Sequence, residues 1–138
     1  MQATWGVQDV PHDGNCLFSA VGNSVGQSAK DLRRQVAEWC SVPGRTINGV
    51  SIRDWVQWNF DVPLERYVQI MSTNGVWGGA QELAVLSNML GLAIIVFQGQ
   101  PKASRILEVV PDAADVSTLR AICILWVGKS HYMRLVPQ

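Results

Sequence analysis

The chain has 138 residues, a length that suits a single domain, and we expect residues 1–138 to form one. Eleven Lys and Arg balance eleven Asp and Glu, and only 16% of residues are charged, which argues against a nucleic-acid-binding protein and against disorder. The three Cys and two His show no C-x-x-C or metal-ligand spacing, so we expect no disulfide framework, no metal and no other cofactor. The longest apolar run, residues 92–97, is too short to span a bilayer, and the N-terminus lacks a signal segment. These features predict a cytoplasmic protein without membrane partners.

The first half of the chain shows helical periodicity, and its apolar stripes are separated by residues that typically begin or end helices. The first predicted helix covers 16–21, with Gly22 or Gly26 as its end, and the second covers 29–40. The residues expected to cap or precede the predicted helices are Asp13 or Asn15, Ser28, Ser51, Pro63 and Gly79.

The second half carries short apolar runs rich in β-branched residues, which predict strands. These runs cover residues 92–97, 105–110, 121–127 and 131–136, with a turn at 128–130 between the last two. Residues 112–119 are expected to form a loop or a short helical turn. A helical first half followed by a strand-rich second half predicts an α+β fold in two layers.

Cys16 stands just after a Gly-Asn turn, at the start of the first predicted helix. Backbone N–H groups and the positive end of the helix dipole would favour its thiolate. Gly14 can adopt a positive φ, which would turn successive N–H groups inward, where they could also hold an oxyanion. The alternative is that Cys16 is only a small buried residue. Cys40 and Cys123 are predicted to pack in the core.

A cysteine nucleophile needs a base, and the two histidines are His12 and His131. We favour His131, because it begins a predicted strand at the rim of the sheet, whereas His12 would have to fold back onto its own nucleophile. Tyr132 is expected to pack beside the ring of His131. Asp13 is expected to accept N–H bonds from two residues further on, and its negative charge would oppose formation of the thiolate.

Trp77 precedes the paired glycines Gly78 and Gly79. A tryptophan before two glycines can form the wall of a narrow slot in which substrate backbone passes close to enzyme backbone. The alternative is a packed tryptophan followed by a glycine-rich helix start. The other tryptophans to which we assign a place are predicted to be core residues: Trp39, Trp55 and Trp126.

Three segments together resemble the ovarian tumour (OTU) family of cysteine proteases. They are DGNCLF at 13–18, WGGAQEL at 77–83 followed by the apolar run LAIIVF, and the His-Tyr pair at 131–132. The resemblance covers nearly the whole chain. It implies a papain-like fold in which a helical N-terminal half packs on a small mixed β-sheet formed mainly by the C-terminal half. The chain is short for the family and looks like a minimal viral or bacterial-effector version, compatible with excision from a larger protein.

The resemblance also implies a function, that of a deubiquitinase. The enzyme would hydrolyse isopeptide bonds after the C-terminal Gly-Gly of ubiquitin or of a ubiquitin-like modifier. Cys16 would be the nucleophile and His131 the general base, while Asp13 would match the signature Asp that supports the loop before the cysteine. Trp77, Gly78 and Tyr132 would contact the substrate. The implied partner is ubiquitin or polyubiquitin, and a monomer in the cytosol is expected.

One position departs from the family pattern. Many members place Asp or Asn two residues after the histidine to orient its ring, and here that residue is Met133. Some relatives use an acid from an N-terminal segment. The nearest upstream acid besides Asp13 is Asp9, to which we assign no role. The departure leaves open a catalytically inactive ubiquitin-binding module. A viral polyprotein protease with the same chemistry is a further alternative.

Overall fold

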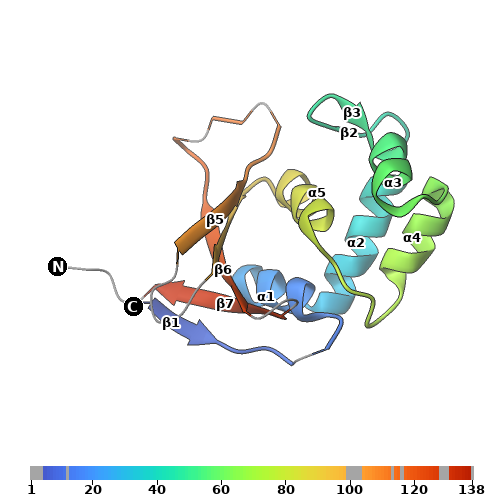
Figure 1. Cartoon of the computed structure of the whole chain (residues 1–138). Helices are drawn as coiled ribbons and strands as arrows, with labels where there is room; N and C mark the ends of the chain where they lie inside the picture. The colour runs from blue at the N-terminus through green and yellow to red at the C-terminus, as the bar shows by residue number, and fades with distance from the viewer. Residues whose placement is uncertain are drawn as a thin grey trace.

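A computed structural model describes residues 5–11, 13–98, 104–112, 114–115, 117–127 and 131–137 (Figure 1). Helices dominate the first half and sheet strands the second, which confirms the predicted α+β class. The elements in chain order are β1 (Trp5–Gln8), α1 (Cys16–Val25), α2 (Ala29–Ser41), β2 (Thr46–Ile47), β3 (Val50–Ser51), α3 (Ile52–Phe60), α4 (Leu64–Ser72), α5 (Ala80–Leu90), β4 (Ala93–Gln98), β5 (Ser104–Val109), β6 (Ala121–Val127) and β7 (His131–Pro137).

The larger sheet has the strand order β1-β7-β6-β4-β5. β4 and β6 are parallel, whereas the other neighbouring pairs are antiparallel, so the sheet is mixed, as predicted. The second half of the chain supplies β4 to β7. The N-terminal strand β1 was not predicted, and neither was the small hairpin of β2 and β3.

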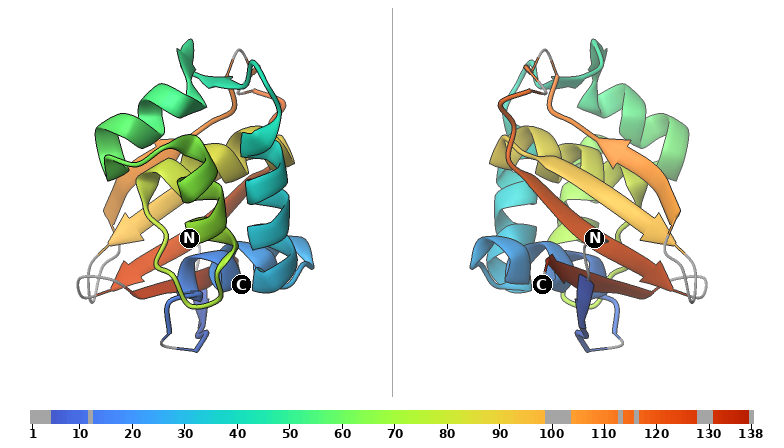
Figure 2. Two further views of the ribbon diagram at one scale, coloured as in Figure 1. Left: turned by 90° about the vertical axis from the view of Figure 1, so that its right-hand side faces the viewer. Right: turned by 90° about the vertical axis from the view of Figure 1, so that its left-hand side faces the viewer.

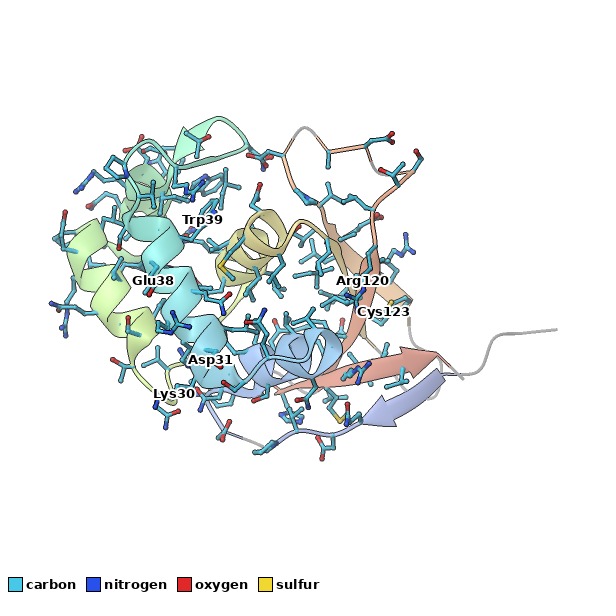
Figure 3. All side chains as sticks on the ribbon, turned by 180° about the vertical axis from the view of Figure 1, so that it is seen from behind. Lys30, Asp31, Glu38, Trp39, Arg120 and Cys123 are labelled. Carbon is cyan, nitrogen blue, oxygen red and sulfur yellow. The ribbon has the colours of Figure 1, made fainter. Side chains whose placement is uncertain are left out.

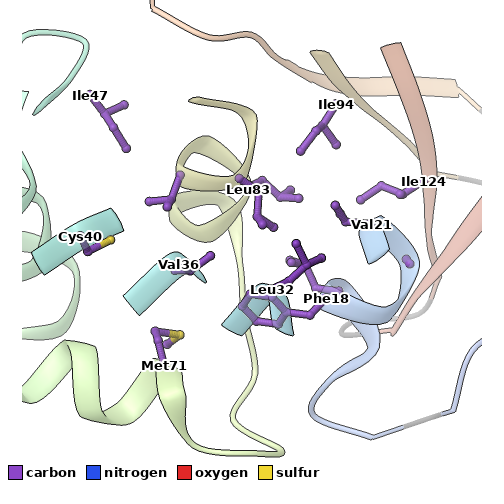
Figure 4. Close-up of a cluster of buried hydrophobic side chains, with 14 of the residues drawn as sticks. Phe18, Val21, Leu32, Val36, Cys40, Ile47, Met71, Leu83, Ile94 and Ile124 are labelled. Atoms are coloured by element: carbon purple, nitrogen blue, oxygen red, sulfur yellow. The ribbon is translucent and has the colours of Figure 1, made fainter. Parts of the chain in front are cut away.

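The helices lie on one face of the larger sheet (Figure 2). Helix α1 packs against β6 and β7, and α5 packs against β4 and β5. α2 contacts both of these helices, and α4 packs on the far side of α2, so α1 and α5 separate the sheet from the outer helices. The core that joins these layers includes Phe18 and Val21 of α1, Leu83 of α5 and Ile94 and Ile124 of the sheet (Figure 4).

The ends of the helices follow the local signals in the sequence. The Ser28 hydroxyl accepts the Asp31 N–H at 3.0 Å, and the Ser51 hydroxyl accepts the Asp54 N–H at 3.1 Å. Gly26, with φ 75°, ends α1 in the left-handed conformation, so α1 runs past the alternative end at Gly22.

The burial of the cysteines and tryptophans agrees only partly with the predictions. Cys40 is buried in the core, and this burial raises its pKa to about 12. Cys123 is only half-buried on β6 (Figure 3), so it is not the core residue that we expected. The tryptophans predicted for the core are likewise half-buried and pack against its outside: Trp39, Trp55 and Trp126.

Two predictions fall on residues outside the described ranges, namely the turn at 128–130 and the position of His12. In the described parts of the chain, no helix has the length and apolar character that a membrane span requires.

Candidate active site

Cys16 is the first residue of α1, and its side chain is completely buried. The backbone N–H groups of Cys16 itself and of Leu17 favour its thiolate, as the helix start predicted. A third main-chain group that favours the thiolate belongs to Tyr132 on β7. The thiol therefore lies between the start of α1 and the start of β7, the strand that begins at His131.

Burial raises the pKa of the Cys16 thiol above its ordinary value. The charge of Asp13 raises it further, as predicted from its position, whereas the three N–H groups lower it without reversing the direction. The resting cysteine therefore favours the protonated form, and a nucleophilic role requires a nearby base to accept the proton.

The three residues before the cysteine, 13–15, form a tight loop that we call the cysteine loop. The Asp13 carboxylate accepts the Asn15 N–H at 2.9 Å, which confirms the predicted structural role of Asp13. The Cys16 N–H donates to the Asp13 carbonyl at 3.2 Å. The Asn15 N–H is thus engaged by a carboxylate and does not point toward an anion site.

The positive φ that we considered as the reason for a glycine at position 14 is not what the structure shows. Gly14 is not among the residues with positive φ. A Cβ at this position would instead collide with the carbonyl oxygen of Gly75. Glycine is required here because the backbone of a distant loop passes directly against it.

His131 is buried at the start of β7, and its Nε2 lies 2.9 Å from Oδ1 of Asp9. Asp9 had no role assigned from the sequence, and the strand pairing explains its place. β1 runs antiparallel to β7 with Gln8 opposite Arg134, so the next residue, Asp9, reaches the level of Met133. The carboxylate that is missing from position 133 is therefore supplied by the neighbouring strand.

The contact with Asp9 fixes the role of each ring nitrogen. With a carboxylate at Nε2, the neutral ring carries its proton on Nε2, and Nδ1 is then the nitrogen that can accept a proton. The Asp9 side chain is 58% exposed, and its Oδ1 also accepts the Val10 N–H at 2.9 Å, which holds the carboxylate in place.

The loop between α4 and α5, residues 73–79, reaches the same region. A Cβ at Gly78 would lie 3.1 Å from Cε2 of Phe18 and 3.6 Å from Leu17, so this loop packs on the first turn of α1. Trp77 is 50% exposed beside it, which is not the packed position of the alternative interpretation.

The buried carboxylate of Glu82 anchors this loop. Its Oε1 accepts the Gly79 N–H at 2.7 Å, and its Oε2 accepts the Tyr67 hydroxyl at 2.6 Å. Burial raises the pKa of Glu82, while the two hydrogen bonds and the charge of Arg33 act in the opposite direction. The predicted helix start after Gly79 is confirmed. The role of Glu82 was not predicted from the sequence, although its position three residues after the cap is the signal of a capping box.

Tyr132 packs against the core beside Cys16, and burial raises the pKa of its hydroxyl. Among the described residues, no three His, Cys, Asp or Glu side chains form a group that could hold a metal ion. The region thus brings together Cys16, His131 and Asp9, with the exposed Trp77 on the adjoining loop.

Comparison with known proteins gives one consistent family. A family model described as OTU-like cysteine protease matches residues 11–134. The "OVARIAN TUMOR DOMAIN-containing deubiquitinating enzyme 4" of Arabidopsis thaliana is 24% identical over an alignment 141 residues long, and the alignment covers 92% of this chain and 42% of the relative. The chain therefore spans less than half the length of that relative.

Solved structures share the fold over nearly the whole chain. The OTU domain of OTUD1 matches with a TM-score of 0.77 at 22% identity, covering 96% of this chain and 85% of that one. A solved ovarian tumour (OTU) domain in complex with ubiquitin matches with a TM-score of 0.71 at 25% identity, covering 99% of this chain and 72% of that one.

Proposed function

The chain belongs to the OTU-like cysteine protease family, and we propose that it is a deubiquitinase. Its reaction is the hydrolysis of isopeptide bonds that follow the C-terminal Gly-Gly of ubiquitin or of a ubiquitin-like modifier. The relative named as a deubiquitinating enzyme and the OTU domain solved in complex with ubiquitin support this substrate class.

The observation that carries the proposal is the arrangement around Cys16. The thiol lies at the start of α1 within reach of the Tyr132 backbone, and the neighbouring His131 is held by Asp9 through Nε2. Nδ1 of His131 is then the atom that exchanges the proton with Cys16. Asp9 orients the ring and stabilises the imidazolium that forms, and it thereby acts as the third residue of a catalytic triad.

The reaction takes place in two stages. His131 accepts the thiol proton, and the Cys16 sulfur attacks the isopeptide carbonyl, forming a tetrahedral intermediate whose oxyanion is stabilised by N–H groups at the start of α1. His131 then protonates the departing lysine amine, which leaves ubiquitin attached to Cys16 as a thioester. In the second stage His131 removes a proton from water, the hydroxide attacks the thioester, and the thiol and the free carboxylate of ubiquitin are released.

The remaining site residues have supporting roles in the proposal. Asp13 supports the cysteine loop through its bond to Asn15 rather than transferring protons. Trp77 and Gly78 border the channel for the Gly-Gly tail, since their loop packs against the first turn of α1. Tyr132 adds the wall on the β7 side. The glycines of the tail suit a channel that is too narrow for larger side chains.

The alternative of an inactive ubiquitin-binding module was based on Met133, which cannot orient the histidine. Asp9 contacts His131 instead, so the reason for this alternative no longer holds. A polyprotein-processing protease would use the same chemistry. The open reading frame that encodes this chain distinguishes the two functions, because self-processing requires that the frame encode further protein.

The proposed setting is a reducing, cytosol-like compartment in which residues 1–138 act as one monomeric catalytic domain with ubiquitin as its partner. The free thiols of Cys40 and Cys123 support this setting.

A panel of di-ubiquitin linkages tests the proposal. Wild type is expected to release mono-ubiquitin from at least one linkage, Cys16→Ala from none, and the control Cys123→Ala at the wild-type rate. Cleavage by Cys16→Ala, or no cleavage of any linkage by folded wild type, would contradict it.

A further inference from the structure

Arg33 is a charged residue with only 2% of its surface exposed, and the proposed chemistry does not use it. It lies on α2, and its guanidinium carbon is 4.4 Å from the centre of the Phe18 ring on α1. A buried cation is costly unless its donors are satisfied, so the partners of this side chain show what it holds together.

One set of partners is the cysteine loop. Nη2 of Arg33 donates to the Gly14 carbonyl at 3.0 Å, and Nε donates to Oδ1 of Asn15 at 2.7 Å. The peptide that joins Gly14 and Asn15 is therefore held at both ends, with its carbonyl on Arg33 and its N–H on the Asp13 carboxylate. Only Asn15 separates this peptide from Cys16, the proposed nucleophile.

The second set of partners lies on either side of residues 73–75, the turn that begins the α4–α5 loop. Nη1 of Arg33 donates to the Met71 carbonyl at 3.0 Å, in the last turn of α4, and Nη2 donates to the Val76 carbonyl. Val76 is the residue before Trp77. The guanidinium thus binds the main chain on both sides of the turn at residues 73–75.

The Asn15 side chain connects the same two loops directly. Its Oδ1 accepts the Gly75 N–H at 3.0 Å in addition to Arg33, and its Nδ2 donates to the Asn74 side chain at 2.6 Å. The close approach of Gly14 to the Gly75 carbonyl belongs to the same junction.

We propose that Arg33 is a positioning residue that holds the cysteine loop and the α4–α5 loop in one fixed arrangement. This inference rests on the proposed function, in which these loops carry the nucleophile and one wall of the tail channel. A fixed arrangement keeps the scissile carbonyl in line with the Cys16 sulfur, and a displacement of about 1 Å in such a site can cost on the order of 100-fold in rate.

Two substitutions separate positioning from folding. Arg33→Lys keeps the buried charge, but a single ammonium cannot reach partners on both loops. Asn15→Ala keeps the bonds of Arg33 to main-chain carbonyls on both loops, and removes the Asn15 side chain that joins Gly75, Asn74 and Nε of Arg33. The matched control is Arg34→Lys on the same helix, because the Arg34 side chain is 59% exposed and pairs with Glu38.

Two measurements are made on each protein, namely kcat and KM with a fluorogenic ubiquitin substrate, and native-state hydrogen exchange of residues 13–17 and 73–79. Arg33→Lys and Asn15→Ala are expected to lower kcat about 10- to 100-fold with KM within about 3-fold of wild type. Both loops are expected to lose exchange protection together, while Arg34→Lys matches wild type.

A folded Arg33→Lys with wild-type kcat, or faster exchange confined to one loop, would overturn the inference. If Arg33→Lys does not fold, Asn15→Ala decides by the same two criteria. If wild type does not cleave the ubiquitin substrate, the proposed function fails, and hydrogen exchange alone still decides whether Arg33 couples the loops.

Discussion

Oδ1 of Asp9 lies 2.9 Å from Nε2 of His131, although the two residues are 122 positions apart in the chain. The antiparallel pairing of β1 with β7 produces this contact, because it brings Asp9 to the level of Met133, two residues from the histidine along the strand. The carboxylate that contacts the ring of His131 thus comes from the neighbouring segment of the chain rather than from the strand of His131 itself.

Removal of the Asp9 carboxylate is expected to slow the reaction without preventing substrate binding. Asp9→Ala should lower kcat on the order of 10- to 100-fold, because the imidazole loses its orientation and the imidazolium its counter-charge. Asp9→Asn should lose less, since an amide oxygen can still accept from Nε2–H. The measurement is kcat and KM on a ubiquitin substrate.

The control is Glu38→Gln, an exposed acid on α2 in the outer helical layer (Figure 3). A wild-type kcat for Asp9→Ala would show that Asp9 has no part in the reaction.

The sequence was sufficient for most of the fold because the relevant signals are local. Ser28 and Ser51 cap the helices that they were expected to cap, and the apolar run at 92–97 forms the buried β4 with a shift of one residue. The start of α1 at Cys16 and the start of β7 at His131 follow from the same kind of signal.

The contacts that the sequence did not predict depend on tertiary structure. Residues 5–8 are too few to show a strand pattern, so the place of Asp9 could not be predicted. Arg33 lies on a helix on which the next residue, Arg34, is exposed, and only the packing of α2 against two distant loops buries Arg33. Gly14 was assigned a conformational role, whereas its actual neighbour, Gly75, lies 61 positions away in the chain.

Substitution of Gly14 is expected to destabilise the protein. The Cβ of Gly14→Ala would meet the Gly75 carbonyl, so one loop has to move, and overpacking of this kind costs about 1–3 kcal/mol. Gly79→Ala is the control, because a Cβ there has its nearest neighbour at 3.9 Å. Denaturant unfolding measures both, and equal free energies of unfolding for the two variants would contradict the steric explanation.

Glu82 is expected to make stability depend on pH. Because burial raises its pKa in the folded state, the folded protein holds the proton more tightly than the unfolded chain does. The contribution of Glu82 to stability is then fully present below its ordinary pKa of 4.5, and this contribution is lost as the pH rises through the raised pKa of the folded state.

The test compares the free energy of unfolding of wild type and Glu82→Gln over a series of pH values above 4.5. As the pH rises, the free energy of unfolding of wild type should fall relative to that of Glu82→Gln, because Gln does not titrate. A constant difference across the series would show that Glu82 does not titrate in this way.

Trp77 is expected to contribute to substrate binding and not to stability. It is 50% exposed, so Trp77→Ala should leave the free energy of unfolding within about 0.5 kcal/mol of wild type. KM for a ubiquitin substrate should rise about 5-fold or more, since truncation of a tryptophan that anchors a binding site costs more than about 1 kcal/mol. Trp58→Ala serves as the comparison, because Trp58 is exposed on α3, outside this loop. An equal change in KM for both variants would contradict a specific role of Trp77 in substrate binding.

The most direct test of the central claim is the covalent capture of Cys16. Folded protein is incubated with ubiquitin that carries an electrophile at its C-terminus, and the adduct is located by intact mass and peptide mapping. One ubiquitin adduct at Cys16, retained in Cys123→Ala and absent from Cys16→Ala, is the predicted result. No adduct, or an adduct at Cys40 or Cys123 instead, would contradict the assignment of Cys16 as the nucleophile of a deubiquitinase.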